Sequence, residues 1–235
     1  MWYKYRKFTS IDEARCWGKR FYSYWLPNFH HNKKKTIYFQ QHPLLIPVFP
    51  LPKTFLLKIF QDSLYRNFLL TFHQVDNWGL AINEKQRYGY TGFTFPQEEL
   101  AEMQDVMDNR LNNSYVPENV WGYRFLDYRK LCIGTQRRYI NCGAVIEDKG
   151  YMGVGLVKSS LKEEFGSYDT LLKIMIPQGA KGLYIDLISN RGEEQELLFA
   201  RGSKLKVLFT YRSRGKKIII CKMLKSKNAD KSKEV

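Results

Sequence analysis

The chain has 235 residues, of which 44% are hydrophobic and 26% charged, a composition that supports one sizeable packed domain and excludes global disorder. Its formal net charge of +15 attracts anions such as nucleic acid, acidic membranes, acidic protein faces or dinucleotide phosphates, without choosing among them. No apolar run reaches the roughly 20 residues that span a bilayer, and the scattered cysteines and histidines lack zinc-site spacing, so we predict no transmembrane segment and no metal.

The first predicted element is a helix from about Ile11 to Tyr24. Ser10 and Glu13 stand three residues apart, in the capping-box pattern that begins many helices. Behind them apolar side chains recur at helical spacing, which predicts an amphipathic helix; they are Ala14, Trp17, Phe21 and Trp25. Pro27 ends the pattern.

The next stretch is the least regular part of the sequence. Residues 29–77 carry a lysine cluster and then an apolar segment with four prolines, which oppose any long regular element. A second helix is predicted from about Pro96 to Leu111, with Thr94 as its N-cap and two glutamates in its first turn. Its apolar stripe consists of Leu100, Met103, Met107 and Leu111.

In the second half, short apolar or alternating runs recur between turn residues, which is typical of strands. The predicted strands are Val120–Phe125, Tyr151–Val157, Leu171–Ile176, Leu183–Leu187, Glu196–Phe199, Lys204–Tyr211 and Lys217–Met223. Helices followed by many strands predict the α+β class. The charged segment 225–235 predicts a disordered basic tail.

The best local signal for chemistry is the segment 193–203, which reads Glu-Glu-Gln-Glu-Leu-Leu-Phe-Ala-Arg-Gly-Ser. In a strand, Glu194 and Glu196 would share one face, because side chains alternate with a period of two. Two carboxylates on one face repel each other, which favours a cation nearby. Such a pair suits glycosyl transfer, where one group stabilises a sugar cation and the other handles the nucleophile, although most pairs of this kind are solvated surface.

This segment resembles the E-x-E-x-L-L-x-x-R-G-S segment of the bacterial ADP-ribosyltransferase exoenzyme toxins of the Arg-Ser-Glu class, which includes Rho-modifying exoenzymes and the enzymatic parts of binary actin toxins. Four further stretches are similar to this family and stand in the family's order: Ala14–Gly18 with Tyr22 and Trp25, Tyr90-Thr91-Gly92, Asn119–Arg124, and Pro177–Ile185 with Ser189. The resemblance covers about residues 8–28 and 78–211. It implies N-terminal helices packed on two small, mostly antiparallel sheets that form an NAD cleft, in a single domain over 1–224 with an insertion at about 29–77.

The resemblance also implies roles for the matching positions. Arg124, which follows Tyr123, binds the NAD phosphate or the nicotinamide ribose, since a guanidinium fork holds two oxygens at once. Glu196 is the catalytic carboxylate, which bonds a ribose hydroxyl and stabilises positive charge at the anomeric carbon. Glu194 orients the acceptor, and in this class a glutamate there goes with arginine acceptors. Phe165 stacks on nicotinamide in one interpretation and anchors a loop or the core in the other.

Two positions depart from the family pattern. Gly153, Val154 and Gly155 stand where the family has Ser-Thr-Ser, whose serines brace the cleft strand and position the catalytic glutamate. The two glycines remain NAD-binding candidates by position, but they lack the hydroxyls and make a strand more flexible. Arg191 replaces an aromatic residue three positions before Glu194, so the acceptor-recognition loop differs.

The resulting hypothesis is a toxin or effector that transfers ADP-ribose from its co-substrate NAD to a protein arginine, with a host GTPase or actin as candidate acceptors. An NAD glycohydrolase and a non-catalytic NAD- or protein-binding module remain alternatives, because Gly153 and Gly155 replace the serines. The charge would suit a nucleic-acid binder, but no such motif is present, and we predict no specific nucleic acid. No apolar segment follows residues 1–7, so we expect no signal peptide and a protein that is cytoplasmic where it is made, with export as its route into a host cell.

Overall fold

The computed structural model describes residues 4–25, 78–89, 97–187 and 193–225. The predicted insertion at 29–77, the segment Tyr90-Thr91-Gly92, Thr94, Ser189, Arg191 and the tail beyond residue 225 lie outside these ranges. Along the chain the elements are α1 (Ile11–Tyr22), the 3-10 helix η2 (Ser23–Trp25), α6 (Trp78–Tyr88), α7 (Gln97–Asn112), β1 (Val120–Leu126), α8 (Tyr128–Gly134), β2 (Val145–Asp148), β3 (Met152–Gly155), α9 (Lys158–Phe165), β4 (Thr170–Ile176), β5 (Gly182–Tyr184), β6 (Glu196–Phe199), β7 (Ser203–Ser213) and β8 (Lys216–Met223).

The strands form a hydrogen-bonded sheet in the order β2-β7-β8-β4-β1-β3-β6-β5. The neighbouring pairs are antiparallel, except that β4 runs parallel to β8. The sheet has a larger part that ends at β1 and a smaller part formed by β3, β6 and β5. These parts are in register at one pair, Tyr123 opposite Gly155. The predicted α+β fold with mostly antiparallel sheets is therefore confirmed, and the two sheets are joined at that pair.

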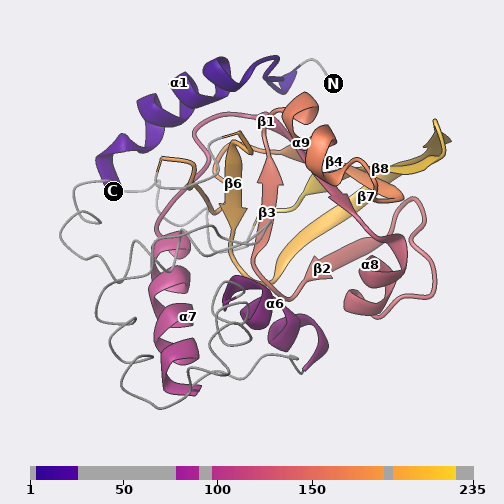
Figure 1. Ribbon diagram of the computed structural model, residues 1–235, viewed down its shortest axis with the longest axis horizontal. Coiled ribbons are helices and arrows are strands. Elements are labelled where there is room, and N and C mark those ends of the chain that lie inside the picture. The colour runs from indigo at the N-terminus through magenta and orange to yellow at the C-terminus, as the bar shows by residue number, and fades with distance from the viewer. Residues whose placement is uncertain (1–3, 26–77, 90–96, 188–192, 226–235) are drawn as a thin grey trace, which may run out of the picture.

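Helices cover both faces of the sheet. In the view of Figure 1, α1 lies at the top of the molecule and α6 and α7 lie at the bottom. Strands β3 and β6 run side by side at the centre. The larger core joins apolar residues of α1, α6 and α7 to one face of the sheet. The smaller core lies on the other face, where Leu161 and Phe165 of α9 pack against Trp121, Tyr123 and Phe125 of β1. Alternate residues of β1 thus enter different cores.

The N-terminal helix forms as predicted and ends two residues earlier, at Tyr22. The Ser10 hydroxyl accepts a hydrogen bond of 3.2 Å from the Glu13 backbone N–H, as an N-cap does. The Glu13 carboxylate returns to Thr9 rather than to Ser10, and accepts a 3.0 Å bond from the Thr9 backbone N–H. The capping box is therefore closed one residue further upstream.

The other predicted elements all have counterparts, but four elements had no prediction. The helix predicted at 96–111 is α7, and the strand predicted at 151–157 ends at Gly155. The structure adds α6, α8, α9 and β2. α8, α9 and β2 span only seven, eight and four residues, which is too short for a periodic pattern to be recognised in the sequence.

The first helix approaches β5 closely at Gly18. A Cβ atom on Gly18 would lie 2.0 Å from Cε1 of Tyr184, well inside any real contact distance. The Tyr184 ring is fully buried there and packs edge-on against Trp17, with centroids 6.1 Å apart. The absence of a side chain at Gly18 therefore sets the distance between α1 and the smaller part of the sheet.

Replacing Gly18 by Ala should lower the free energy of unfolding by about 1–3 kcal/mol, because the new methyl group forces the Tyr184 ring to move. Urea unfolding at constant pH measures the change. Gly134→Ala is the matched control, since its Cβ would lie at an ordinary 3.7 Å from Tyr88. Equal stability of Gly18→Ala and the wild type would contradict the close approach.

Candidate active site

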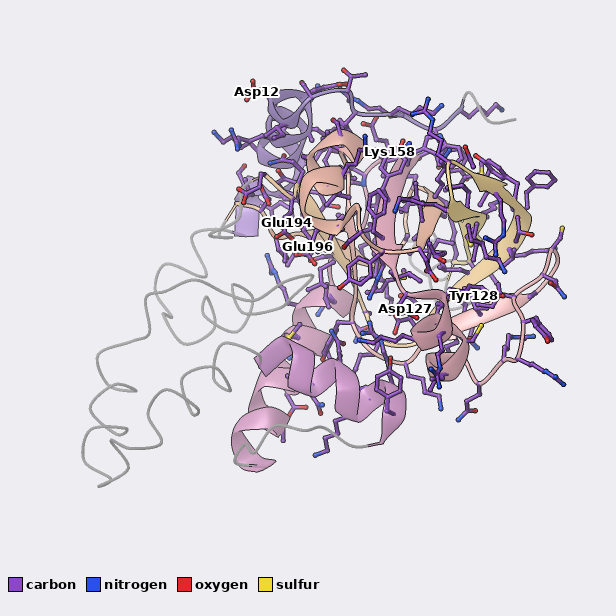
Figure 2. The ribbon with its side chains drawn as sticks, turned by 45° about the vertical axis from the view of Figure 1, so that its right-hand side comes forward. Asp12, Asp127, Tyr128, Lys158, Glu194 and Glu196 are labelled. Carbon is purple, nitrogen blue, oxygen red and sulfur yellow. The ribbon has the colours of Figure 1, made fainter. Side chains whose placement is uncertain are left out.

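The two glutamates of the predicted catalytic segment lie close together at the start of β6 (Figure 2). Glu194 and Glu196 are buried, with 4% and 3% of their surfaces exposed. Gln195 between them has a left-handed backbone, with φ of 51°. The predicted strand alternation is therefore wrong for Glu194, because the strand begins at Glu196. A turn at Gln195, rather than a strand, sets the relation of the two carboxyl groups.

Two residues fix Gln195: Tyr184, which ends β5, and Asp186, which follows that strand. Its Oε1 accepts a 2.6 Å hydrogen bond from the Tyr184 hydroxyl, and its Nε2 donates a 2.7 Å bond to Oδ2 of Asp186. The nearby backbone N–H groups of Gln195 and Glu196 act to lower the pKa of the Asp186 carboxyl, against the larger effect of its burial. The turn at Gln195 is thus fixed by residues at the end of the neighbouring strand, β5. No sequence spacing pointed to Asp186, because this contact forms only when β5 pairs with β6.

The electrostatic setting of Glu196 is unusual for a carboxyl group. Burial raises the pKa of Glu196 well above its usual range, and the carboxyls of Glu194 and Asp186 raise it further, while Arg124 lowers it. The anionic form of Glu196 is therefore stabilised by any positive charge placed beside it. A carboxyl group in this setting suits a reaction that develops a sugar cation.

Arg124 belongs to a buried ion cluster with Arg87 of α6 and Asp148 of β2. Nη1 of Arg124 lies 3.4 Å from Oδ2 of Asp148. Arg87 binds the same carboxylate through both oxygens, with Nε 2.7 Å from Oδ1 and Nη2 2.9 Å from Oδ2. Burial and the neighbouring charge of Arg87 lower the pKa of Arg124 to about 10. Two guanidinium groups on one carboxylate leave a net positive charge, which suits the binding of an anion.

The helix that carries Arg87 is attached to the turn before β3. The Asn83 side chain accepts a 2.7 Å bond from the Tyr151 backbone N–H, and Arg87 Nη2 donates a 2.9 Å bond to the Tyr151 carbonyl. A Cβ on Gly150 would lie 2.4 Å from Asn83 Oδ1, so this turn requires a glycine. Sequence reasoning missed Arg87 and Asp148. The available signal was the spacing of Asn83 and Arg87, which puts them on one helix face.

The structure does not bring two other candidates to this cluster. Tyr123 precedes Arg124 in β1 and therefore projects to the opposite face, into the smaller core. Phe165 lies in the same core and stacks on Tyr168, with centroids 6.3 Å apart. This position supports the interpretation of Phe165 as a core anchor rather than as a platform for nicotinamide.

The two glycines that replace the serines lie in β3, directly beside β6. Gly155 stands opposite Glu196, and Gly153 stands opposite Leu198. A Cβ on Gly155 would lie 2.5 Å from Cδ1 of Leu161. Helix α9 therefore packs against β3 at the place where a serine side chain would stand. The glycine permits this contact between Leu161 and β3.

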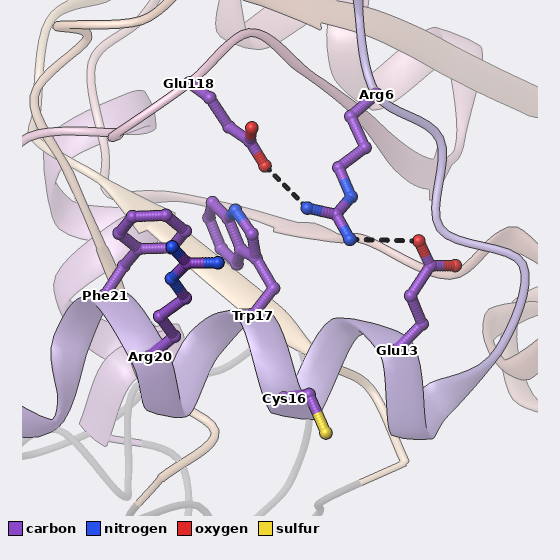
Figure 3. Close-up of a pocket in the computed structure, with 7 residues that line it drawn as sticks. All are labelled: Arg6, Glu13, Cys16, Trp17, Arg20, Phe21 and Glu118. Carbon is purple, nitrogen blue, oxygen red and sulfur yellow. Dashed lines mark hydrogen bonds and ion pairs between the residues drawn. The ribbon is translucent and has the colours of Figure 1, made fainter.

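A surface pocket of about 350 Å³ opens beside α1, and none of the candidate residues lines it (Figure 3). Arg6 crosses it and binds Glu118 at 3.0 Å and Glu13 at 3.2 Å. The remaining lining residues are Cys16, Trp17, Arg20 and Phe21. The two carboxylates already neutralise Arg6, so this pocket offers less positive charge than its arginines suggest.

The described residues include neither a metal site nor a helix that could span a membrane. No group of three or more histidine, cysteine, aspartate or glutamate side chains is placed to hold a metal ion. No helix there has the length and apolar character needed to cross a membrane.

The sequence matches the ADP-ribosyltransferase exoenzyme family over residues 77–230, which is more than half of the chain. The chain belongs to this family. No curated protein sequence matches it significantly. The matched region contains Arg87, Arg124, Asp148, Glu194 and Glu196, so the cluster described above lies within the part of the chain that defines the family.

Solved structures of ADP-ribosylating toxins share the fold. Plx2a, an ADP-ribosyltransferase toxin from Paenibacillus larvae, superposes with a TM-score of 0.61 and 17% identity over 92% of this chain and 97% of its own. C3stau2 from S. aureus with NAD gives 0.60 and 17% identity over 95% and 100%. BECa of a binary enterotoxin of C. perfringens with NADH gives 0.64 and 17% identity, over 94% of this chain and 50% of its own.

Restoring serine at Gly155 should destabilise the protein by about 1–3 kcal/mol, because its Cβ collides with Leu161. In the Leu161→Ala background the same substitution should be better tolerated. A double-mutant cycle of urea unfolding free energies measures this coupling. An equal loss in both backgrounds would show that Leu161 is not the obstacle.

The protonation of Asp186 should make stability depend on pH. Burial raises its pKa from 3.8 to about 7, so between about pH 4 and pH 7 the native state retains a proton that the unfolded state has released. Stability therefore falls as pH rises through this range. Asp186→Asn should remove this contribution, so its stability relative to the wild type should be higher at pH 7.5 than at pH 4.5. Urea unfolding at both values tests it, and a constant difference would refute the assignment.

Proposed function

We propose that this protein is an NAD-dependent mono-ADP-ribosyltransferase that modifies an arginine of a protein acceptor in a host cell. The observation that carries the proposal is that Arg124, whose side chain is 15% exposed, lies close enough to the buried Glu196 carboxyl to lower its pKa. A cationic group that would bind phosphate and a carboxyl group that would stabilise a sugar cation thus lie in one region of the protein. The family membership and the neighbours solved with NAD and NADH support a dinucleotide substrate.

Arg124 and Arg87 are the groups that would hold the phosphates of NAD. Both are largely buried, with 15% and 16% of their side chains exposed. A dinucleotide diphosphate carries two negative charges, and the cluster with Asp148 has one net positive charge, so binding neutralises charge that is costly to bury. NAD supplies the ribosyl group and nicotinamide as leaving group.

Glu196 would stabilise the ribosyl cation as the bond to nicotinamide breaks. Its anionic form gains more from an adjacent cation than an exposed carboxylate would, because little water screens the interaction. Tyr184 and Asp186 hold the preceding residue, Gln195, and so fix where the Glu196 carboxyl points. This is preorganisation, in which the stabilising group is in place before the charge develops.

Glu194 would orient the acceptor. A carboxylate pairs naturally with a guanidinium group, and an arginine of the acceptor would also relieve the repulsion between Glu194 and Glu196. In the related toxins a glutamate at this position goes with arginine acceptors. The protein acceptor itself, with a GTPase or actin as candidates, is proposed on the same resemblance.

The expected order of mutational effects follows from these roles. Glu196→Gln should reduce both nicotinamide release and protein labelling by about 10²–10³-fold, because a neutral amide cannot stabilise the cation. Glu194→Gln should reduce labelling more than hydrolysis. The measurement is incubation with labelled NAD, with and without cell lysate, following free nicotinamide and protein-bound label.

Glu147→Gln is the matched control, because Glu147 is an exposed carboxylate that pairs with Lys204 at the surface. Full activity of Glu196→Gln would refute the catalytic assignment. Nicotinamide release without label on any protein would identify a glycohydrolase. Saturable NAD binding with neither product would identify a non-catalytic binding module.

A further inference from the structure

Asp148 is the central residue of the ion cluster, and neither the catalytic segment nor the phosphate-binding role accounts for it. We infer that Asp148 is a positioning residue: it ties Arg124 to Arg87 and holds the Arg124 guanidinium apart from Glu196, so that Arg124 can bind a phosphate of the dinucleotide. This inference rests on the proposed function, because it assigns Asp148 a task in NAD binding.

Two carboxyl groups, those of Asp148 and Glu196, interact with the Arg124 guanidinium. It is hydrogen-bonded to Asp148 at 3.4 Å, and it interacts electrostatically with Glu196. Within the described ranges no ion pair joins Arg124 to Glu196. If the two closed on each other, the phosphate-binding group and the catalytic carboxyl would both be occupied. The bond to Asp148 holds Arg124 in the open arrangement.

The two arginines of the cluster form different numbers of hydrogen bonds. Arg87 gives Asp148 two short bonds and the Tyr151 carbonyl a third, so it acts as a rigid support. Arg124 gives Asp148 only Nη1, and among the described residues its other N–H groups have no hydrogen-bond acceptor. Those remaining donors form the fork that two phosphate oxygens fit. Asp148 therefore orients Arg124 without occupying it.

Asp148 is itself well fixed. Its Oδ1 accepts a 3.0 Å bond from the Gly150 backbone N–H, and its carbonyl accepts a 2.8 Å bond from the Gly202 N–H. The residue also pairs with Ser203 of β7. The backbone of Asp148 is thus part of the sheet, and Arg87 joins α6 to the Asp148 carboxylate. This rigidity is what a group needs in order to set the position of a flexible arginine.

The test compares ADP-ribose affinity and NAD kinetics in four proteins: the wild type, Asp148→Asn, Glu147→Gln and Asp148→Asn with Glu196→Gln. Asn keeps an acceptor oxygen for the Gly150 N–H and removes the charge. We expect Asp148→Asn to weaken ADP-ribose binding and raise KM for NAD by at least about tenfold, with kcat within about threefold of the wild type. Glu147→Gln, its neighbour on the exposed side of β2, should behave as the wild type.

The double variant separates positioning from a merely structural role. If Asp148→Asn weakens binding because Arg124 closes on Glu196, then Glu196→Gln in the same protein should recover much of the ADP-ribose affinity. Failure of that rescue, or unchanged or tighter ADP-ribose binding by Asp148→Asn, would overturn the inference. Thermal unfolding checks that each variant is folded; if Asp148→Asn is not, Asp148→Glu replaces it, and its displaced carboxylate should give a smaller rise in KM.

Failure of the inference and failure of the proposed function give different results. A wild-type protein that binds ADP-ribose but releases no nicotinamide would refute the proposed enzyme, and the ADP-ribose affinities would still decide the role of Asp148. A wild-type protein that binds neither NAD nor ADP-ribose would refute both.

Discussion

The pairing of β1 with β3 is the constraint on which the candidate site depends. One register pair, Tyr123 with Gly155, joins the larger part of the sheet to the part that carries Glu196. Because Arg124 follows Tyr123 and Glu196 stands opposite Gly155, this junction brings the arginine and the glutamate into electrostatic contact.

Burying so many charges near this junction requires that each have a compensating group. Asp148 compensates Arg87 and Arg124, and its pKa is lowered by both despite its burial. Burial raises the pKa values of Glu196 and Asp186, and the opposing effects of Arg124 on Glu196 and of Arg15 on Asp186 do not cancel it. Such an arrangement is destabilising unless a ligand completes it, which is typical of functional sites.

Gly155 of β3 has a structural explanation that its sequence did not suggest. Taken against the family pattern, Gly153 and Gly155 are simply missing serines. In the structure, α9 packs on β3 so closely that Leu161 would collide with any side chain at Gly155. The glycine and the close packing of the helix are therefore linked, because a side chain at Gly155 would require Leu161 to move.

The α+β class, the first helix, α7 and the seven strands were predictable from the sequence, because these have strong periodicity and clear turn residues. The family and the candidates Arg124, Glu194 and Glu196 were predictable from an ordered set of motifs. The places of Arg87, Asp148 and Asp186 beside them came from the three-dimensional structure. So did the turn at Gln195 and the position of Tyr123 and Phe165 in the opposite core. Those relations depend on which strands pair and which helix docks, and contacts between residues tens of positions apart leave no periodic trace in a single sequence.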